Sequence, residues 1–220
     1  MSLAPIEIET GPNPTASVIL MHGLGADGND FVPICNELEL GTVGPVRFVF
    51  PNAPVMPVTV NNGYPMPAWY DIYGADLVKR EDEAGLRRSM ATIEGLIAHE
   101  KARGIASNRI VIAGFSQGCA MALLTGLRHS ERLAGIVALS GYLPLAASTE
   151  AERSEANRDV PIFMGHGTRD GVVVLARATA ARDALAALGY TVEWHAYPIE
   201  HSVCLEEIAD LGDWLRRVLA

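Results

Sequence analysis

The chain has 220 residues, of which 49% are hydrophobic, and it carries a formal net charge of −9. This length suits one domain with a substantial core, and the apolar content excludes a disordered chain. The excess of acidic residues argues against binding to nucleic acid or to anionic membranes, because both need clusters of Lys and Arg.

Strands and helices are expected to alternate from one end of the chain to the other. The hydrophobic patterns predict strands at residues 6–10, 17–21, 46–50, 110–113, 135–139, 161–165 and 191–197. They predict helices at residues 29–38, 81–103, 119–124, 173–188 and 203–219. This order predicts an α/β fold in one domain, residues 1–220, with a mostly parallel sheet and helices on both faces.

Two segments interrupt the alternation. Residues 51–73 hold five of the 13 prolines together with several Met, Tyr and Trp side chains. A long apolar loop is usually functional, so we expect it to form the wall of a pocket, the alternative being a loop packed on the core. Residues 142–159 are polar and rich in alanine, and we expect solvated surface there.

The cysteines and the N-terminal segment indicate the cellular compartment of the protein. Cys35, Cys119 and Cys204 are odd in number and widely spaced, so we expect reduced thiols in a cytoplasmic protein and no metal site. The first 12 residues lack a basic stretch followed by an apolar one, so we expect no signal peptide. No apolar run has the length of a membrane span.

Residues 114–118 read Gly-Phe-Ser-Gln-Gly and lie between a predicted strand and a predicted helix. A strand, a tight turn and a helix with serine at the turn are typical of a nucleophile elbow, in which Gly114 and Gly118 leave room for the crowded backbone. The alternative is a turn serine, or a serine that caps the helix. Partners of Ser116 decide between these interpretations.

A serine hydroxyl needs a base, and the base needs an orienting carboxylate. In sheets of this kind the three residues come in the order Ser, then Asp or Glu, then His, each after a strand. Asp170 and His201 follow the strands at 161–165 and 191–197, which predicts a triad of Ser116, Asp170 and His201. His22 and His166 are expected only to shape nearby loops.

An oxyanion hole would complete this chemistry. One N–H donor should belong to the residue after the nucleophile, Gln117, and the other to the loop after an early strand, where Leu24 is the candidate. Gly23, Gly25 and Gly28 in that loop also match G-x-G-x-x-G, a dinucleotide fingerprint. No acidic residue lies between Glu39 and Asp71 to bind a ribose, which disfavours nucleotide binding.

The sequence resembles the carboxylesterase/acyl-protein thioesterase (phospholipase/carboxylesterase) family of small α/β-hydrolases, most closely the bacterial carboxylesterases. The motifs that carry this resemblance are HGLGADGNDFVPI, FPNAPVMPVTVNNGYPMPAWYDI, GFSQGCAMAL, LSGYLP, HGTRD and HSVCLEEI. It implies Ser116 as nucleophile, His201 as base, Asp170 as acid, and Leu24 and Gln117 as oxyanion donors. It also implies that Trp69 and the proline-rich segment, with Met56 and Met66, lie beside the acyl group. Gly171 and Glu200 depart from the family pattern beside the triad.

These observations predict a serine hydrolase that cleaves carboxylic esters of short to medium acyl chains, without metal or cofactor. One alternative is an acyl-protein thioesterase that acts on S-acylated proteins. Another is an inactive binding protein on a hydrolase fold. The expected partner is a small-molecule ester and not nucleic acid, and homodimerisation stays open.

Overall fold

The computed structural model describes residues 4–74 and 80–220. Residues 1–3 and 75–79 lie outside the described part. Residues 1–3 begin the N-terminal segment in which no signal peptide is expected. None of the described helices combines the length and the apolar character needed to cross a bilayer.

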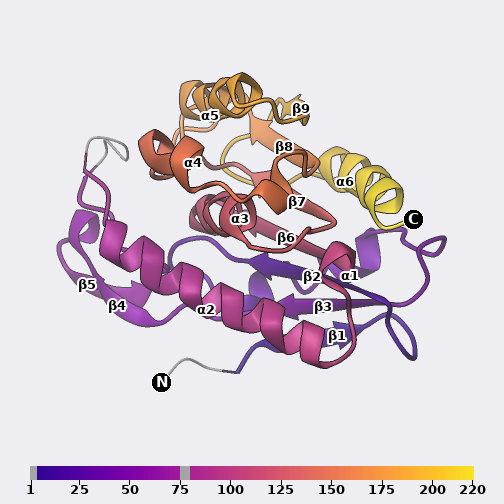
Figure 1. Cartoon of the computed structure of the whole chain (residues 1–220). Coiled ribbons are helices and arrows are strands. Elements are labelled where there is room, and N and C mark those ends of the chain that lie inside the picture. The colour runs from indigo at the N-terminus through magenta and orange to yellow at the C-terminus, as the bar shows by residue number, and fades with distance from the viewer. Residues whose placement is uncertain (1–3, 75–79) are drawn as a thin grey trace.

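A seven-stranded sheet runs through the centre of the protein (Figure 1). Only the edge strand β1 is antiparallel to its neighbour, and the other strands are parallel. The strands in spatial order are β1 (Ile6–Glu9), β3 (Val46–Phe50), β2 (Ala16–Met21), β6 (Ile110–Phe115), β7 (Gly135–Leu139), β8 (Ile162–Gly167) and β9 (Val192–Tyr197). The predicted α/β class is therefore confirmed, and it places the carboxyl ends of β6, β8 and β9 at one edge of the sheet.

Helices cover both faces of the sheet because its inner strands are apolar on both sides. In β2, Ile19 and Met21 belong to one buried cluster, whereas Val18 and Leu20 belong to the other. The first cluster contains residues of α2 (Glu83–Ala102), α3 (Gln117–Arg128) and α5 (Leu175–Ala187). The second contains residues of α1 (Ile34–Glu37) and α6 (Leu205–Val218).

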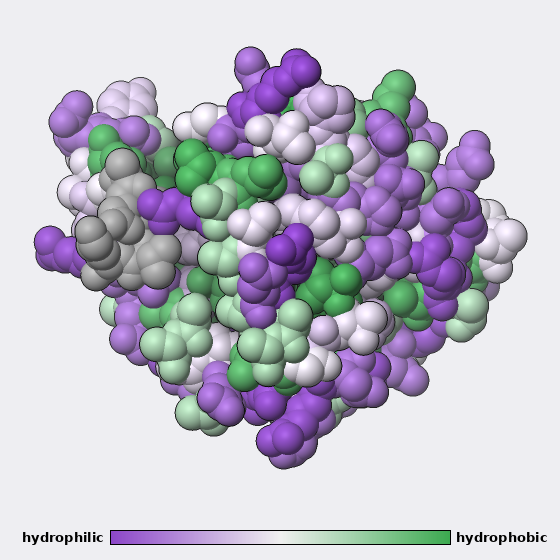
Figure 2. All heavy atoms as spheres, turned by 90° about the horizontal axis from the view of Figure 1, so that it is seen from above, coloured by the Kyte–Doolittle hydropathy of each residue, from purple (hydrophilic) through white to green (hydrophobic). Residues whose placement is uncertain are grey.

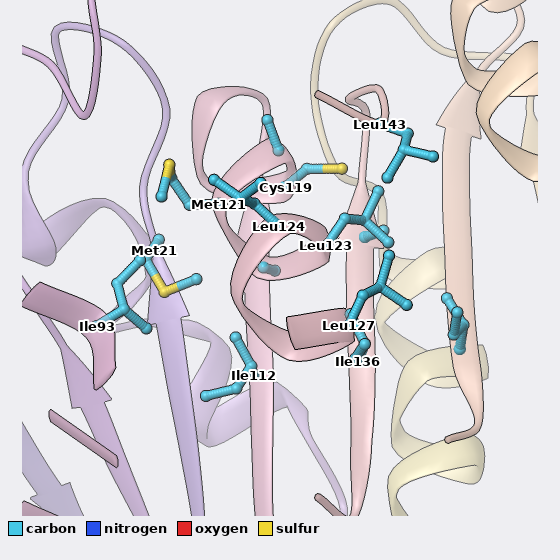
Figure 3. Packing of buried hydrophobic residues seen from close by; sticks show 14 of the residues in the cluster. Met21, Ile93, Ile112, Cys119, Met121, Leu123, Leu124, Leu127, Ile136 and Leu143 are labelled. Carbon is cyan, nitrogen blue, oxygen red and sulfur yellow. The ribbon is translucent and has the colours of Figure 1, made fainter. Parts of the chain in front are cut away.

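Helix α3 packs most deeply of all the helices. Eleven of its residues, from Gln117 to Leu127, are buried. Figure 3 shows its Met121, Leu124 and Leu127 among Ile112 of β6 and Ile136 of β7. This packing holds the helix that follows the Gly-Phe-Ser-Gln-Gly turn rigidly against the sheet.

The predicted helix at residues 29–38 is wrong in part, because the segment divides at Pro33. A 3-10 helix spans Gly28–Phe31 and α1 spans Ile34–Glu37. Proline has no N–H to donate to the residue four positions earlier, so one continuous helix would lack a hydrogen bond at this point.

Residues 142–159 are not the solvated surface that their composition predicts. They contain α4 (Ala146–Glu152) and a 3-10 helix at Glu155–Asn157, and the side chain of Asn157 is fully buried. Its amide accepts a hydrogen bond from the Leu133 N–H at 2.9 Å and donates to the backbone oxygens of His129 and Glu131. The polar side chain of Asn157 is thus buried because it forms hydrogen bonds with backbone groups of a loop that is distant in the sequence.

Residues 51–73 form a small hairpin as well as loops. Strand β4 (Val55–Val58) pairs with β5 (Tyr64–Pro67), and Pro57 lies opposite Pro65. Proline is tolerated there because a two-stranded ribbon has outer edges that need no N–H donor. A 3-10 helix at Thr59–Asn61 joins the two strands.

Candidate active site

Ser116 sits in a strained turn between β6 and α3. Its backbone has φ 56° and ψ −115°, a conformation that non-glycine residues rarely adopt. A Cβ at Gly114 would overlap the backbone of Gly118, and one at Gly118 would overlap the backbone of Met21. The two glycines therefore allow the sharp turn that exposes the serine at the end of the strand.

The structure brings the three residues of the predicted triad together. The Ser116 Oγ lies 2.9 Å from the His201 Nε2, and the His201 Nδ1 lies 2.6 Å from the Asp170 Oδ2. In the tautomer with a proton on Nδ1, the imidazole donates to Asp170 and accepts from the Ser116 hydroxyl. This is the arrangement in which a serine hydroxyl can lose its proton to an imidazole.

The loop after β8 fixes the carboxylate. The Asp170 Oδ1 accepts hydrogen bonds from the N–H groups of Val172 and Val173, each at 2.8 Å, and its side chain is fully buried. His166 supports the same loop, since its Nε2 lies 2.8 Å from the Val173 carbonyl. Burial lowers the pKa of His166, which favours the neutral ring in this supporting position.

Gly171 and Glu200 lie beside the triad, at two positions where the sequence differs from the family that it resembles. A Cβ at Gly171 would meet nothing within 4 Å, so the glycine is not required by crowding. Glu200 is exposed, and no hydrogen bond or ion pair between described residues joins its side chain to His201. The carboxylate that His201 contacts is Asp170.

The two predicted oxyanion donors also come close to Ser116. Leu24, Ser116 and Gln117 line the same cavity. Within residues 4–74 and 80–220, the backbone N–H groups of Leu24 and Gln117 donate to no backbone or side-chain acceptor. They are available to a bound oxygen atom, as an oxyanion hole requires.

His22 shapes the loop that carries Leu24. Its Nδ1 lies 2.7 Å from the Gly23 carbonyl, and its Nε2 accepts from the Ala53 N–H at 3.1 Å. Burial lowers the pKa of His22, so the ring stays neutral and can hold one donor and one acceptor at once. The predicted loop-shaping role of His22 agrees with these contacts.

Trp69 is hydrogen-bonded to the loop that carries Leu24. Its indole Nε1 donates to the His22 carbonyl at 2.9 Å, and its backbone N–H donates to the Gln117 Oε1 at 3.0 Å. The Ser89 hydroxyl of α2 donates to its carbonyl. Trp69 is 2% exposed and does not line the cavity, and its hydrogen bonds connect the turn at Ser116, α2 and the loop that carries Leu24.

The predicted contact residues differ from those that the structure places beside Ser116. Met56 and Met66 lie opposite each other in the hairpin, and neither they nor Trp69 line the cavity. The cavity has a volume of about 260 Å³ and is largely apolar. Residues 51–73 do form one wall of it, through other side chains, namely Val60, Asn61, Tyr70 and Ile72.

The lining also includes residues that the sequence did not single out. Tyr142, Val172 and Val173 line the cavity, and the Tyr142 hydroxyl lies 2.9 Å from the Tyr70 hydroxyl. Tyr142 follows β7 at the carboxyl end of the sheet, where ligands of such folds bind. Its position after a predicted strand is the feature of the sequence that could have identified it as a cavity residue. Both tyrosines are buried.

The structure gives no support to the nucleotide-binding alternative. The N–H of Gly28, the third glycine of the motif, donates to the Asn52 Oδ1 at 2.9 Å. Asn52, which follows β3 where a nucleotide-binding fold would have an acidic residue, thus has its side-chain amide hydrogen-bonded to the glycine-rich loop. In the described part of the chain, no group of three or more His, Cys, Asp or Glu is placed to hold a metal ion.

Comparison with known proteins identifies the family. The model of the phospholipase/carboxylesterase family matches residues 5–219. The chain is 41% identical to acyl-protein thioesterase 1 of Neurospora crassa over 220 residues, which cover 96% of this chain and 90% of that protein. It is 40% identical to acyl-protein thioesterase 1 of Yarrowia lipolytica over 206 residues, covering 91% of each protein.

Solved structures agree with this result. The crystal structure of Arabidopsis thaliana SOBER1 is 31% identical to the chain, with a TM-score of 0.87 over 93% of this chain and 99% of that one. The fold that the resemblance implied is therefore confirmed as the α/β-hydrolase fold. The chain belongs to the phospholipase/carboxylesterase family of serine hydrolases.

Proposed function

We propose that the protein hydrolyses acyl thioesters and esters through an acyl-enzyme on Ser116, and that S-acylated cysteines of proteins are its substrates. The observation that carries the proposal is the hydrogen-bonded series from Ser116 through His201 to Asp170 beside an apolar cavity. Such a cavity suits an acyl chain, because burial of each methylene is favourable by about 0.8 kcal/mol.

The reaction follows from these positions. The Ser116 Oγ attacks the acyl carbonyl carbon while the His201 Nε2 takes its proton, and the N–H groups of Leu24 and Gln117 bind the oxyanion. His201 then gives the proton to the leaving thiolate or alkoxide. Water attacks the acyl-serine with His201 again as the base, which releases the fatty acid and restores Ser116. Asp170 stabilises the imidazolium in both steps.

The relatives favour a thioester substrate over the carboxylic ester that the sequence first predicts. The curated relatives at about 40% identity are named acyl-protein thioesterase 1. The chemistry of Ser116 is the same for esters and thioesters, so carboxylesterase activity on short and medium acyl chains remains the second candidate. The three cysteines are free thiols, which supports a cytoplasmic protein.

The test compares matched substrates. A peptide with an S-octanoyl cysteine and the same peptide with an O-octanoyl serine differ only in the bond that is cleaved. We expect the wild type to release octanoate from the S-acyl peptide with the larger kcat/KM. Ser116→Ala should lower kcat by about a million-fold, the size of effect known for a triad serine, without changing the circular dichroism spectrum.

Other outcomes separate the alternatives. Cleavage of p-nitrophenyl octanoate together with failure on the S-acyl peptide would identify a carboxylesterase. A wild type that cleaves no acyl substrate, and that fluorophosphonate does not label at Ser116, would identify an inactive binding protein on a hydrolase fold.

A further inference from the structure

Tyr142 lines both the cavity beside Ser116, called the acyl cavity below, and a second hollow. This second hollow, the distal groove, has a volume of about 390 Å³ and lies between α4 and α5. Leu143 and Ala146 line it near α4, and Ala176, Ala180 and Ala184 line it along α5. The two helices lie side by side in Figure 1. Tyr142 is the residue that lines both hollows.

The ring of Tyr142 is held in place. Its hydroxyl is hydrogen-bonded to the hydroxyl of Tyr70, and Tyr142 is only 5% exposed. Burial raises the pKa of the Tyr142 hydroxyl to about 12, so both hydroxyls stay protonated and the bond persists at neutral pH. A buried aromatic ring that is fixed at its polar end forms a rigid wall.

We propose that Tyr142 sets the upper limit of acyl-chain length, and that without its ring the distal groove receives the end of a longer chain. This inference rests on the proposed function in one respect, since it needs an acyl chain in the cavity beside Ser116. The distal groove suits that occupant because its lining is mostly apolar, with Arg177 as its charged residue, and because it shares Tyr142 with the acyl cavity. On the face that Figure 2 shows, hydrophobic residues form small groups among hydrophilic ones.

The first part of the test removes the wall. Tyr142→Ala should shift the preferred length of p-nitrophenyl esters upward by several methylenes, measured from butyrate to palmitate in one non-ionic detergent. Each methylene that gains a buried site should raise kcat/KM by roughly fourfold relative to the shorter ester. Tyr142→Phe is the matched control, because it keeps the ring and should keep the wild-type length limit. Tyr142→Leu is the second variant in case the alanine variant does not fold.

The second part fills the groove. Ala180 is exposed on α5 and lies outside the acyl cavity, so Ala180→Leu alone should leave the wild-type length profile unchanged. Combined with Tyr142→Ala, it should remove most of the gain for long chains. A gain that Ala180→Leu does not reduce would overturn the role of the groove, and an unchanged profile in Tyr142→Ala and Tyr142→Leu would overturn the role of Tyr142. Simple esters report chain length whether or not S-acyl peptides are cleaved, so either failure is distinct from failure of the proposed function.

Discussion

Asp170 is the residue whose substitution tests the orientation of the base most directly. Its Oδ2 is 2.6 Å from the His201 Nδ1, and its Oδ1 is fixed by two backbone N–H groups. Asp170→Asn keeps the size of the side chain but presents an amide donor, which favours the tautomer with a proton on Nε2. We expect kcat to fall by up to about ten-thousand-fold, with KM little changed.

The measurement is steady-state kinetics on p-nitrophenyl butyrate. Glu200→Gln is the control, because this carboxylate is next to the base in sequence but exposed. It should retain activity within a few-fold of the wild type. Near-normal activity of Asp170→Asn, with loss of activity in Glu200→Gln, would assign the orienting role to Glu200.

Trp69 is predicted to act on the rate rather than on chain length. Trp69→Phe keeps a buried ring but removes the indole donor to the His22 carbonyl, so the loop that carries Leu24 is held less firmly. One lost hydrogen bond is worth about 1 kcal/mol, which corresponds to a fall in kcat of roughly fivefold. The kcat should fall alike for acetate, butyrate and octanoate esters.

If Trp69→Phe instead alters the chain-length profile, Trp69 contacts the acyl group, as the resemblance implied. Ser89→Ala is the matched control, since it removes a hydrogen bond to the same residue but none to the loop that carries Leu24. It should lower stability without a comparable fall in kcat.

The residues that carry the proposed chemistry could be predicted because their order along the chain is informative. Ser116, Asp170 and His201 each follow a strand of a parallel sheet, and such positions converge at one edge. The residues that line the cavity could not be predicted in the same way. An aromatic residue in a loop can face a pocket or bind the backbone behind it, and only the three-dimensional contacts of Trp69 and Tyr142 distinguish the two cases.

At the scale of elements, the loop that carries Asp170 can be made more rigid. Gly171 has space for a Cβ, and its φ lies outside the left-handed region that favours glycine. Gly171→Ala should therefore raise the free energy of unfolding by about 0.4–1 kcal/mol, because alanine restricts the unfolded chain. Chemical denaturation measures this change, and kcat should stay within a few-fold of the wild type. A decrease in stability would mean that the loop needs the freedom of glycine.

The elements that were predicted best are the apolar strands. Residues 46–50 and 135–139 have the predicted bounds, since each is a short run of buried, mostly apolar residues. The segment at residues 142–159 was predicted poorly because some of its buried residues are polar. Thr149 and Asn157 are fully buried, and the contacts that make Asn157 favourable there reach across 24 to 28 positions of the chain.

At the scale of the whole molecule, one buried acid links stability to pH. Glu207 of α6 is fully buried beneath Gly165 of β8, and the backbone N–H of Cys204 offsets only part of the cost of burying its carboxylate. Burial raises its pKa to about 8. The folded protein therefore keeps this proton between about pH 4.5 and pH 8, whereas the unfolded chain releases it.

Stability should accordingly fall as pH rises through this window. The contribution of Glu207 to the free energy of unfolding should decrease by up to about 1.4 kcal/mol per pH unit, until the folded state also ionises near pH 8. Glu207→Gln keeps the size of the side chain and has no proton to release. In urea unfolding at pH 5, 6.5 and 8, the variant should gain stability relative to the wild type as pH rises. All other titrations are common to both proteins and cancel in the difference, so parallel pH curves would show that the Glu207 carboxyl ionises as readily in the fold as in water.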